Sequence, residues 1–516
     1  MHASAFLLLH SSRTDLNRLR LALSPFDAKT DELVAKILKE LHVPGAALAV
    51  VDGEKTWSKG YGIADVDSQA IVTSKTLFSC ASVTKPFTAA AAAVLVEDEK
   101  HNITWESRMC ELIPDDFVLV DDYATKHITL EDCLSHRTGI ATHHADLGGH
   151  SLRQNVKNMR HLDITRELRT KWQYSNHMYL AVSLMIEEKT GQPLGEFMRD
   201  RLWHPLGMET TFLGVQDALA YQESHPGVEL AGRHMWDEEA TSFKTLPAWD
   251  DLGLSGAGAM VSSVADCAEW IRALIEQKAP ISSQVYEVLT SAHMILKPKS
   301  PRFTGPVCYG LGWYVAVYRG ERVLYHPGGL IGSVASLIIL PDRKIGVAGM
   351  CNITNEEALD AAMWHIIDEY LEVPEDARTD FIEEAKQGLQ GMKYFAENAK
   401  AIMFPPETLH EPAVPPSVSV TRLLGSYTHP SYGTIILKEY DGQAAIHGVY
   451  PGRLPLDPLI LQHIDSDIFL ARADLVDMIP VRAKATFKTD AAGDQLKLGV
   501  DFEEGLTMWF VRDRDV

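Results

Sequence analysis

The sequence lacks the features typical of membrane, secreted and nucleic-acid-binding proteins. Its six cysteines include no C-x-x-C spacing, and in a chain of 516 residues this predicts reduced, mostly buried thiols rather than a disulfide framework. No apolar run approaches the roughly 18 residues of a membrane span, and the run at 5–9 is too short for a secretory signal. Acidic residues outnumber basic ones by 70 to 48, a formal net charge of −22. We therefore expect a cytoplasmic protein whose partners include neither membranes nor nucleic acid.

Several familiar catalytic and cofactor motifs are also missing. The chain has no Walker A loop, no G-x-S-x-G elbow, no complete G-x-G-x-x-G and no H-E-x-x-H. Histidines do gather at His143, His144 and His150, but no nearby spacing of carboxylate and histidine fits a zinc site. We predict no metal and no cofactor, and we interpret residues 141–160 as a loop beside a pocket.

One stretch of the chain does indicate chemistry. Residues 78–97 contain the only S-x-x-K of the sequence, formed by Ser82 and Lys85, and continue through five alanines into an apolar helix. Pro86 suits the first turn of that helix, so Ser82 should lie at its start with Lys85 on the same face. A buried lysine loses proton affinity and can then act as a base toward a hydroxyl. The alternative is a serine that only caps the helix, beside a solvated lysine.

The first 375 residues predict an α+β fold. Short apolar strands are expected at both ends of this part of the chain: 45–51, 57–61, 309–313, 323–329, 334–340 and 345–350. Helices are expected at 29–41, 128–139, 179–190, 266–275 and 358–371. This order predicts an antiparallel sheet whose first and last strands meet, flanked by the terminal helices, with a helical subdomain inserted. Residues 214–250 are expected to be irregular.

The composition changes after this part. Residues 376–402 are typical of a charged helix, and 404–416 hold five prolines, which is a linker composition. From Leu423 onward apolar residues recur with period two, which predicts a small all-β barrel or sandwich. Its expected strands are 433–439, 444–449, 459–464, 482–488, 495–500 and 507–511. The predicted domains are an N-terminal extension (1–27), a catalytic domain (28–375), a helical and proline-rich linker (376–416) and a β-barrel domain (417–516).

Three short motifs stand in a fixed order along the first part of the chain. They are Ser82-Val-Thr-Lys85, Tyr174-Ser-Asn176 and His326-Pro-Gly328. With the supporting segments at 134–139, 205–208 and 309–313, residues 30–373 resemble the serine β-lactamase and penicillin-binding-protein superfamily. The most similar branch contains class C β-lactamases, D-aminopeptidases, family VIII esterases and related acyltransferases. The resemblance implies the α/β sandwich of the β-lactamase/transpeptidase-like fold. The segment that begins at Leu424 resembles the lipocalin-like barrel that some members append.

The resemblance also implies catalytic roles. Ser82 would attack a carbonyl group and become acylated, and Lys85 would help to remove its proton. Tyr174 would carry that proton to the leaving group and later activate the acyl acceptor. The backbone N–H groups of Ser82 and Gly329 would form the oxyanion hole, where two preorganised donors stabilise the developing charge.

On the substrate side, the resemblance implies that Asn176, His326 and Gly328 contact the bound molecule. His326 stands where β-lactamases carry a lysine. A histidine is mostly neutral at pH 7, so it cannot hold a substrate carboxylate as a permanent cation does. This favours small esters or peptide-like amides over β-lactams. The alternative is a histidine that only fills the edge of the sheet.

Three functional classes stay open at this point. Hydrolysis of a small ester or amide comes first, and acyl transfer to an acceptor other than water is second because the same site can do both. A non-catalytic binding protein is third, because the usual mark of such a protein is a lost motif residue and here the motif set is intact. The identity of the acyl group is expected to depend on residues 141–170 and 214–250. The barrel could be a passive appendage, a wall of the acyl pocket or a homo-oligomer contact, and we favour contact with the active-site face.

Overall fold

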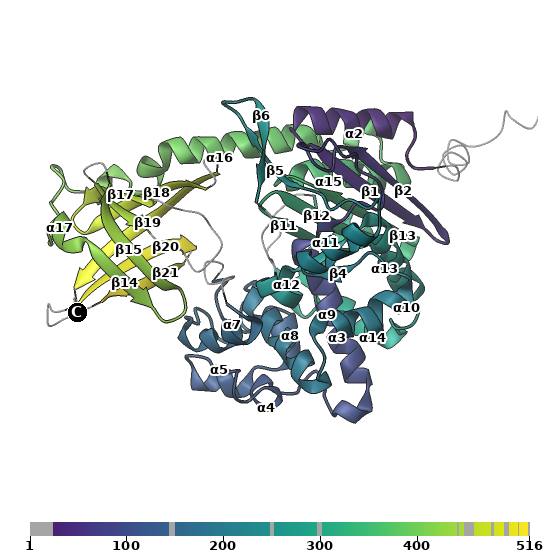
Figure 1. Cartoon of the computed structure of the whole chain (residues 1–516), viewed down its shortest axis with the longest axis horizontal. Helices are drawn as coiled ribbons and strands as arrows, with labels where there is room; N and C mark the ends of the chain where they lie inside the picture. Colours follow the sequence, from purple (N-terminus) through teal and green to yellow (C-terminus); the bar gives the residue numbers. More distant parts are fainter. Residues whose placement is uncertain are drawn as a thin grey trace, which may run out of the picture.

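The computed structural model describes residues 24–143, 150–247, 252–296, 302–440, 443–447, 459–475, 479–489, 495–503 and 505–513. Within these ranges an α+β part precedes a closed β-barrel, as the sequence predicts. A long helix lies between the two parts (Figure 1). No helix of the described ranges has the length and apolar character needed to cross a membrane.

The α+β part is built on one antiparallel sheet of eight strands within the described residues. In spatial order they are β2 (Lys55–Gly62), β1 (Gly45–Asp52), β13 (Ile345–Cys351), β12 (Ser333–Leu340), β11 (Glu321–Leu330), β10 (Tyr314–Tyr318), β9 (Val307–Tyr309) and β8 (Met294–Leu296). β1 pairs with β13, so Ala46 lies opposite Cys351 and Asp52 opposite Ile345. The predicted meeting of the first and last strands is confirmed.

Both faces of this sheet are covered, which explains why β1 is a continuous apolar run. Leu48 and Val50 pack with helices α2 (Ala28–Glu40) and α15 (Glu356–Tyr370) on one face. Ala47 and Ala49 point the other way, toward α13 (Val264–Glu276). The alternation follows from the two-residue period of a strand. Figure 1 shows α2 and α15 together on one side of the sheet.

The helical subdomain is built around two central helices. These are α3 (Thr84–Glu97), whose alanines are fully buried, and α8 (Asn176–Thr190), which packs against it. Gly191 ends α8 in the left-handed conformation, with φ of 71°, as expected for a glycine at that position. The other helices of this part are α4 (Met109–Leu112), α5 (Asp122–His127), α6 (Leu130–Leu134), α7 (Leu152–Asn158), α9 (Leu194–Met198), α10 (His204–Leu206), α11 (Val215–Ser224), α12 (Ser255–Gly258) and α14 (Ser283–Thr290).

Some local predictions for this part were wrong. Residues 310–313, expected to belong to a strand, form the turn between β9 and β10 instead. The helix expected over 128–139 is only α6, because His136 adopts a left-handed φ of 57°. That turn lets Asp132 pair with Arg137 and, from far along the chain, with Arg169. The segment 214–250, expected to be irregular, contains α11 and a hairpin of β5 (Arg233–Asp237) and β6 (Ser242–Leu246), although 248–250 lie outside the described residues.

The C-terminal barrel closes through pairing of its first and last strands. Its described strands, in spatial and chain order, are β14 (Gly425–His429), β15 (Gly433–Tyr440), β16 (Gln443–His447), β17 (Leu459–Asp465), β18 (Ile468–Leu475), β19 (Ile479–Thr489), β20 (Leu496–Glu503) and β21 (Leu506–Arg512). Tyr427 of β14 pairs with Arg512 of β21. The prediction of a small all-β barrel is confirmed, although β14 and β18 were missing from the predicted strands.

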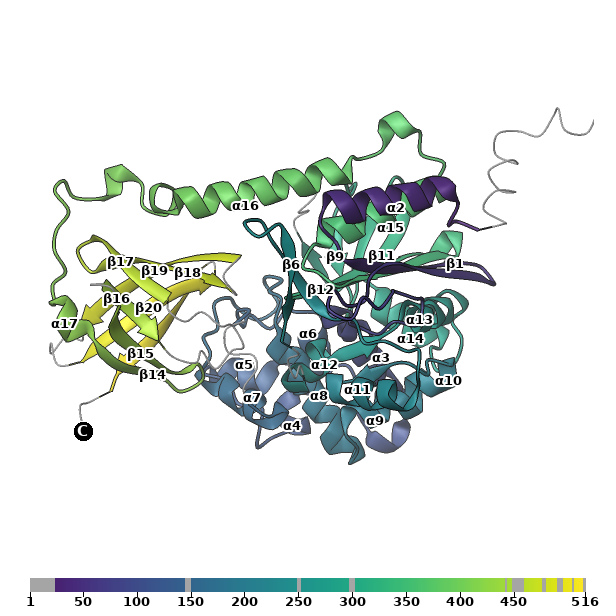
Figure 2. The same cartoon turned by 45° about the horizontal axis from the view of Figure 1, so that its top comes forward.

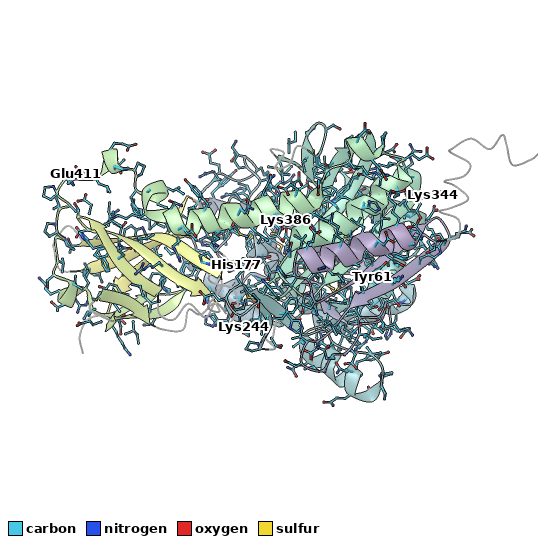
Figure 3. The ribbon with its side chains drawn as sticks, turned by 90° about the horizontal axis from the view of Figure 1, so that it is seen from above. Tyr61, His177, Lys244, Lys344, Lys386 and Glu411 are labelled. Carbon is cyan, nitrogen blue, oxygen red and sulfur yellow. The ribbon has the colours of Figure 1, made fainter. Side chains whose placement is uncertain are left out.

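Helix α16 (Phe381–Met403) connects the two parts (Figure 2). Its first half packs on α15, and Lys386 forms an ion pair of 2.7 Å with Glu40 of α2. Its far end contacts β19, and Phe404 packs with Ile464 and Leu470 of the barrel. In Figure 3, Lys386 lies beside α2 while Glu411, in the segment after the helix, lies at the barrel end.

Candidate active site

Ser82 lies at the start of the central buried helix, as predicted. The short strand β3 (Phe78–Ser79) leads into a 3₁₀ turn, η1 (Ala81–Val83), and α3 follows directly. The N-cap positions of η1 and α3 are Cys80 and Val83, so Ser82 is not a cap residue. Ala81 has a left-handed φ of 49°, an uncommon conformation for a residue with a side chain. This backbone presents the Ser82 hydroxyl to the neighbouring elements.

Lys85 is fully buried, so the alternative of a solvated lysine is wrong. Its Nζ donates to Asn176 Oδ1 at 2.6 Å and to the Ala257 carbonyl at 2.7 Å, and it lies 3.1 Å from Ser82 Oγ. Burial lowers the pKa of Lys85 well below its usual value. A neutral amine has two N–H donors and one lone pair. The two carbonyl acceptors use the donors, which leaves the lone pair for the serine hydroxyl.

Tyr174 is the second side chain that contacts the Ser82 hydroxyl. Its OH donates to Ser82 Oγ at 2.7 Å, and Lys85 Nζ lies 4.6 Å from the centre of its ring. Burial raises the pKa of Tyr174, and the Glu356 carboxylate adds to the rise. The tyrosine therefore keeps its proton, while the lysine loses its proton readily. Because the pKa values of Lys85 and Tyr174 shift in opposite directions, a base and a proton donor both lie at the Ser82 hydroxyl.

His136 fixes the position of the Tyr174–Asn176 segment, and no sequence argument singled it out. Its Nδ1 accepts the backbone N–H of Ser175 at 3.1 Å. Its buried ring packs 4.4 Å from the Tyr174 ring and 4.9 Å from the Tyr309 ring, centre to centre. The segment 134–139 supported the family resemblance, but only the left-handed turn at His136 shows what that residue contacts.

The strand β11 passes directly over the Ser82 turn, and glycine permits this approach. A Cβ atom on Gly328 would lie 2.4 Å from the Cys80 carbonyl oxygen and 2.8 Å from the Ser82 nitrogen. Ser333 Oγ also donates to the Ser79 carbonyl at 2.9 Å, which fastens β12 to the same turn. The third motif is thus brought to the first one. Gly329, the next residue, lines the cavity above Ser82.

His326 also borders that cavity, but its ring is held by the protein. The side chain is 1% exposed. Its Nδ1 donates to the Pro327 carbonyl at 2.7 Å, and its Nε2 accepts from the Tyr309 OH at 3.0 Å. Burial and the charge of Lys85 lower the pKa of His326 to about 3, so the ring is neutral at pH 7. Its predicted contact with substrate stays a prediction.

The cavity above Ser82 has a volume of about 580 Å³. Besides the motif residues, its wall includes Trp172, Gln173, Tyr314 and Glu356. Glu356 begins α15, and its Oε1 lies 2.9 Å from where a Cβ of Gly329 would be. Among the described lining residues it is the one carboxylic acid. Sequence analysis missed it, because nothing in its local pattern shows that α15 meets β11 at this point.

The described residues contain no group of three or more histidines, cysteines or carboxylates that could hold a metal ion. His144 lies outside the described residues. The His143 ring bonds to the Tyr432 OH of the barrel and to the Asp163 carbonyl of the catalytic part. The loop expected at 141–160 instead ends in α7.

Comparisons with known proteins show the family of the chain. A family model described as Beta-lactamase matches residues 30–372. An unguisins hydrolase, ungD', from Aspergillus campestris is 32% identical over 508 residues, covering 95% of this chain and 93% of the relative. The corresponding ungD of Aspergillus violaceofuscus is 34% identical over 514 residues, covering 94% and 89%. The chain belongs to the β-lactamase family. It is a hydrolytic enzyme of the β-lactamase-like serine hydrolases.

Solved structures show the same fold at lower identity. The octameric penicillin-binding protein homologue from Pyrococcus abyssi aligns with a TM-score of 0.61 and 18% identity, covering 94% of this chain and 99% of that one. The D-amino acid amidase from Ochrobactrum anthropi gives 0.52 and 21%, covering 70% and 100%. EstCE1, a hydrolase with promiscuous acyltransferase activity, gives 0.57 and 18%, covering 68% and 99%.

Proposed function

We propose that the protein hydrolyses a small ester or amide through a covalent acyl-enzyme on Ser82. The observation that carries this proposal is the Ser82 hydroxyl, placed between the Nζ of a fully buried lysine and the OH of Tyr174. A serine hydroxyl is a weak nucleophile until a neighbouring base takes its proton. Here the base and a proton carrier both touch the same oxygen.

In the acylation step, Ser82 Oγ attacks the substrate carbonyl carbon while its proton moves to Lys85 Nζ. The carbonyl oxygen becomes an oxyanion beside the backbone N–H groups of Ser82 and Gly329, a stabilisation of the kind worth roughly 3–4 kcal/mol per donor in other enzymes. The bond to the leaving group then breaks. Lys85 returns its proton through Tyr174 to the departing oxygen or nitrogen.

Deacylation reverses these proton movements with water as the nucleophile. Tyr174 and Lys85 accept a proton from the water, whose oxygen attacks the acyl carbon of the ester on Ser82. The ester bond breaks, Ser82 recovers its proton, and the carboxylic acid leaves. Asn176, which fixes Lys85 Nζ at 2.6 Å, keeps the base in position throughout the cycle.

The charge of the cavity bears on the substrate class. The neutral His326 offers no cation for a substrate carboxylate, and the exposed Glu356 carboxylate repels one. These two features favour neutral or cationic esters and amides over β-lactams, whose recognition in the family uses a cation in the third motif.

Acyl transfer to a non-water acceptor is the second candidate. The same acyl-enzyme serves both reactions, and the EstCE1 neighbour is described as having acyltransferase activity beside hydrolysis. Added alcohols or amines that yield a transfer product at the expense of the free acid would favour this reading.

We also propose the domain division predicted from the sequence, with a catalytic domain at 28–375, a linker at 376–416 and a barrel domain at 417–516. The family model ends at residue 372, near the first of these boundaries. Assembly into a homo-oligomer is a further proposal, supported by the octameric state of the Pyrococcus abyssi homologue. Light scattering on the purified protein tests it.

The experiment for the proposed reaction is a substrate screen on purified enzyme and on Ser82→Ala. The panel contains p-nitrophenyl esters, D-amino acid amides and a chromogenic β-lactam. We expect turnover of esters or amides by the wild type, none by Ser82→Ala, and little β-lactam cleavage. Equal turnover by the two proteins would overturn the proposal.

A further inference from the structure

The helical subdomain contains a large cavity of its own, which we call the helical cavity. Its volume is about 880 Å³, near the upper end of the range of small-ligand pockets, roughly 300–1,000 Å³. Its walls come from α8, α9, α11, the start of α12 and the short strand β4 (Phe212–Leu213). The described linings of this cavity and of the cavity above Ser82 have no residue in common. A molecule bound here would therefore lie outside the space that serves the reaction at Ser82.

The charge around the helical cavity is mainly negative. Three carboxylic acids line it, namely Glu187 of α8, Glu196 of α9 and Asp217 of α11. Arg199 is the one arginine or lysine of the described lining, and its Nε lies 3.3 Å from a carboxylate oxygen of Asp200. A cationic ligand therefore suits this cavity better than an anionic one.

One buried hydroxyl of the wall indicates where a ligand would be held. Ser255, the first residue of α12, lines the cavity and is 3% exposed. Its Oγ has no hydrogen-bond partner among the described residues, and it is not one of their buried side-chain oxygens that water cannot reach. Buried polar groups normally have partners, so this accessible hydroxyl indicates a bound group that supplies one.

The fold brings the Glu187 carboxylate to the same part of the cavity. The N–H of Gly256, next to Ser255, donates to Ser183 Oγ at 3.2 Å. Glu187 follows Ser183 by one turn on the same face of α8. Its Oε1 accepts the backbone N–H of Leu194 at 3.0 Å, which leaves Oε2 without a partner among the described residues. Burial raises the pKa of Glu187, and a cation beside the carboxylate would oppose that rise.

The remaining wall suits an apolar group. Phe212 and Tyr221 are half-buried, with ring centres 5.1 Å apart, and Leu194 and Leu213 also line the cavity. Aromatic faces attract ammonium groups as well as apolar groups. The space is far larger than a single metal ion needs, and the described residues contain no group of three metal-ligating side chains. An organic cation therefore fits the wall better than an inorganic one.

We propose that the helical cavity binds a primary amine that carries an aromatic or alkyl body. The ammonium group would donate to Ser255 Oγ and to Glu187 Oε2, and the body would pack against Phe212 and Tyr221. A primary ammonium has three N–H donors, so it can satisfy both acceptors at once, which a quaternary ammonium cannot. This binding site is additional to the active site and does not depend on the reaction proposed at Ser82.

Calorimetric titration of the full-length protein with 2-phenylethylamine near neutral pH tests the proposal. The matched control ligand is 2-phenylethanol, which has the same ring and chain length but a neutral hydroxyl in place of the ammonium group. We expect the amine to bind with a Kd of about 1 mM or below, a range open to ligands of this size. The alcohol should bind at least about 10-fold more weakly.

Two variants change the site by separate routes. Glu187→Gln removes the charge and keeps an acceptor for the Leu194 N–H, so the Kd of the amine should rise about 10-fold, equal to about 1.4 kcal/mol. Ser255→Ala removes the unpaired hydroxyl and should raise the Kd about fivefold. The matched control is Glu188→Gln, at the adjacent exposed carboxylate that pairs with Arg153, and it should keep the wild-type Kd.

The active site has a carboxylate of its own, so Glu356→Gln shows in which cavity the amine binds. We expect this variant to keep the wild-type Kd. Binding that survives Glu187→Gln and Ser255→Ala but is lost in Glu356→Gln would overturn the proposal, because the amine would then lie above Ser82. No binding by the wild type up to about 10 mM, or equal binding of the alcohol and the amine, would overturn it as well. Melting curves identify a variant that does not fold, and the other variant then decides.

Discussion

The strand β11 and the strands of the barrel are both antiparallel, but they differ in what they bury. Around β11 the protein buries polar side chains that carry specific partners, including Lys85, His136 and His326. The barrel interior instead holds apolar side chains at alternate positions: Ile435, Leu437, Leu459, Leu461, Phe469, Phe487, Leu498 and Phe510. Burying polar groups costs free energy unless each one is paired, so a protein concentrates them where they do chemistry.

This contrast separates two kinds of effect. Substitutions among the buried polar groups should change the rate of bond breaking. Substitutions in the barrel should change which molecules fit, because Glu503 and Gly505 of the barrel line another cavity that shares Thr142 and Gln173 with the cavity above Ser82. The hydrogen bonds described for Ser82 Oγ go instead to Lys85 and Tyr174.

Lys85→Met keeps the length of the side chain and removes the base. Because general base catalysis contributes about 10²–10⁴-fold, we expect kcat/KM on a p-nitrophenyl ester to fall about 10³-fold. Asn176 Oδ1 and the Ala257 carbonyl would also lose their donor, so the melting temperature should fall. Lys59→Met, at a half-exposed ion pair with Asp31, is the control and should keep its rate. Retention of wild-type turnover by Lys85→Met would show that this lysine is structural.

Tyr174→Phe removes only the hydroxyl that touches Ser82 Oγ. Loss of the proton carrier should lower kcat by about 10²-fold, with little change in stability. Tyr179→Phe is a matched control, since its buried OH donates to the Leu134 carbonyl and not to Ser82. That variant should lose melting temperature and keep its rate. The reverse pattern, with a stable and slow Tyr179→Phe and an active Tyr174→Phe, would contradict the assignment.

The pH profile reports the state of Lys85. Its neutral form is the base, so kcat/KM should rise with pH as the lysine loses its proton, with a midpoint below the usual lysine pKa because burial lowers that pKa. Asn176→Asp places a carboxylate where an amide oxygen now lies 2.6 Å from Nζ. A negative charge at that distance favours the protonated lysine and should move the midpoint upward by about 1–3 pH units. An unchanged profile would exclude Lys85 as the titrating base.

Tyr432→Phe tests the barrel side and should have the smallest effect on chemistry. It removes the OH that contacts His143 Nδ1 and leaves the catalytic part intact. We expect a loss of stability of about 1 kcal/mol, the usual value of one such hydrogen bond. On a small ester, kcat/KM should change by less than about twofold, a barrier change of under 0.5 kcal/mol. A large fall in kcat on that ester would show that the barrel acts directly in catalysis.

The sequence predicts those features that depend on local pattern or motif order. The S-x-x-K at Ser82 and Lys85 indicates a buried lysine beside a serine because an alanine helix follows it. The apolar strands expected at the two ends of the first part of the chain predict that β1 pairs with β13. Gly191 predicts the end of α8. Each of these depends on residues close in the chain, or on apolar runs that must be covered on both faces.

Features that depend on distant contacts were missed. The helix expected over 128–139 ends at Leu134, and the turn that follows is accompanied by pairing of Asp132 with Arg169, 37 positions along the chain. Glu356 enters the cavity only because α15 begins beside Gly329. No period or propensity of the sequence contains that information.

The most direct test of acylation at Ser82 is the mass of the covalent adduct on that residue. The wild-type protein is incubated with a fluorophosphonate or a slowly released acyl donor, digested, and the modified peptide is sequenced by mass spectrometry. We expect one adduct, on Ser82, that is absent in Ser82→Ala and forms much more slowly in Lys85→Met. A label on a different residue, or ester turnover that persists in Ser82→Ala, would contradict it.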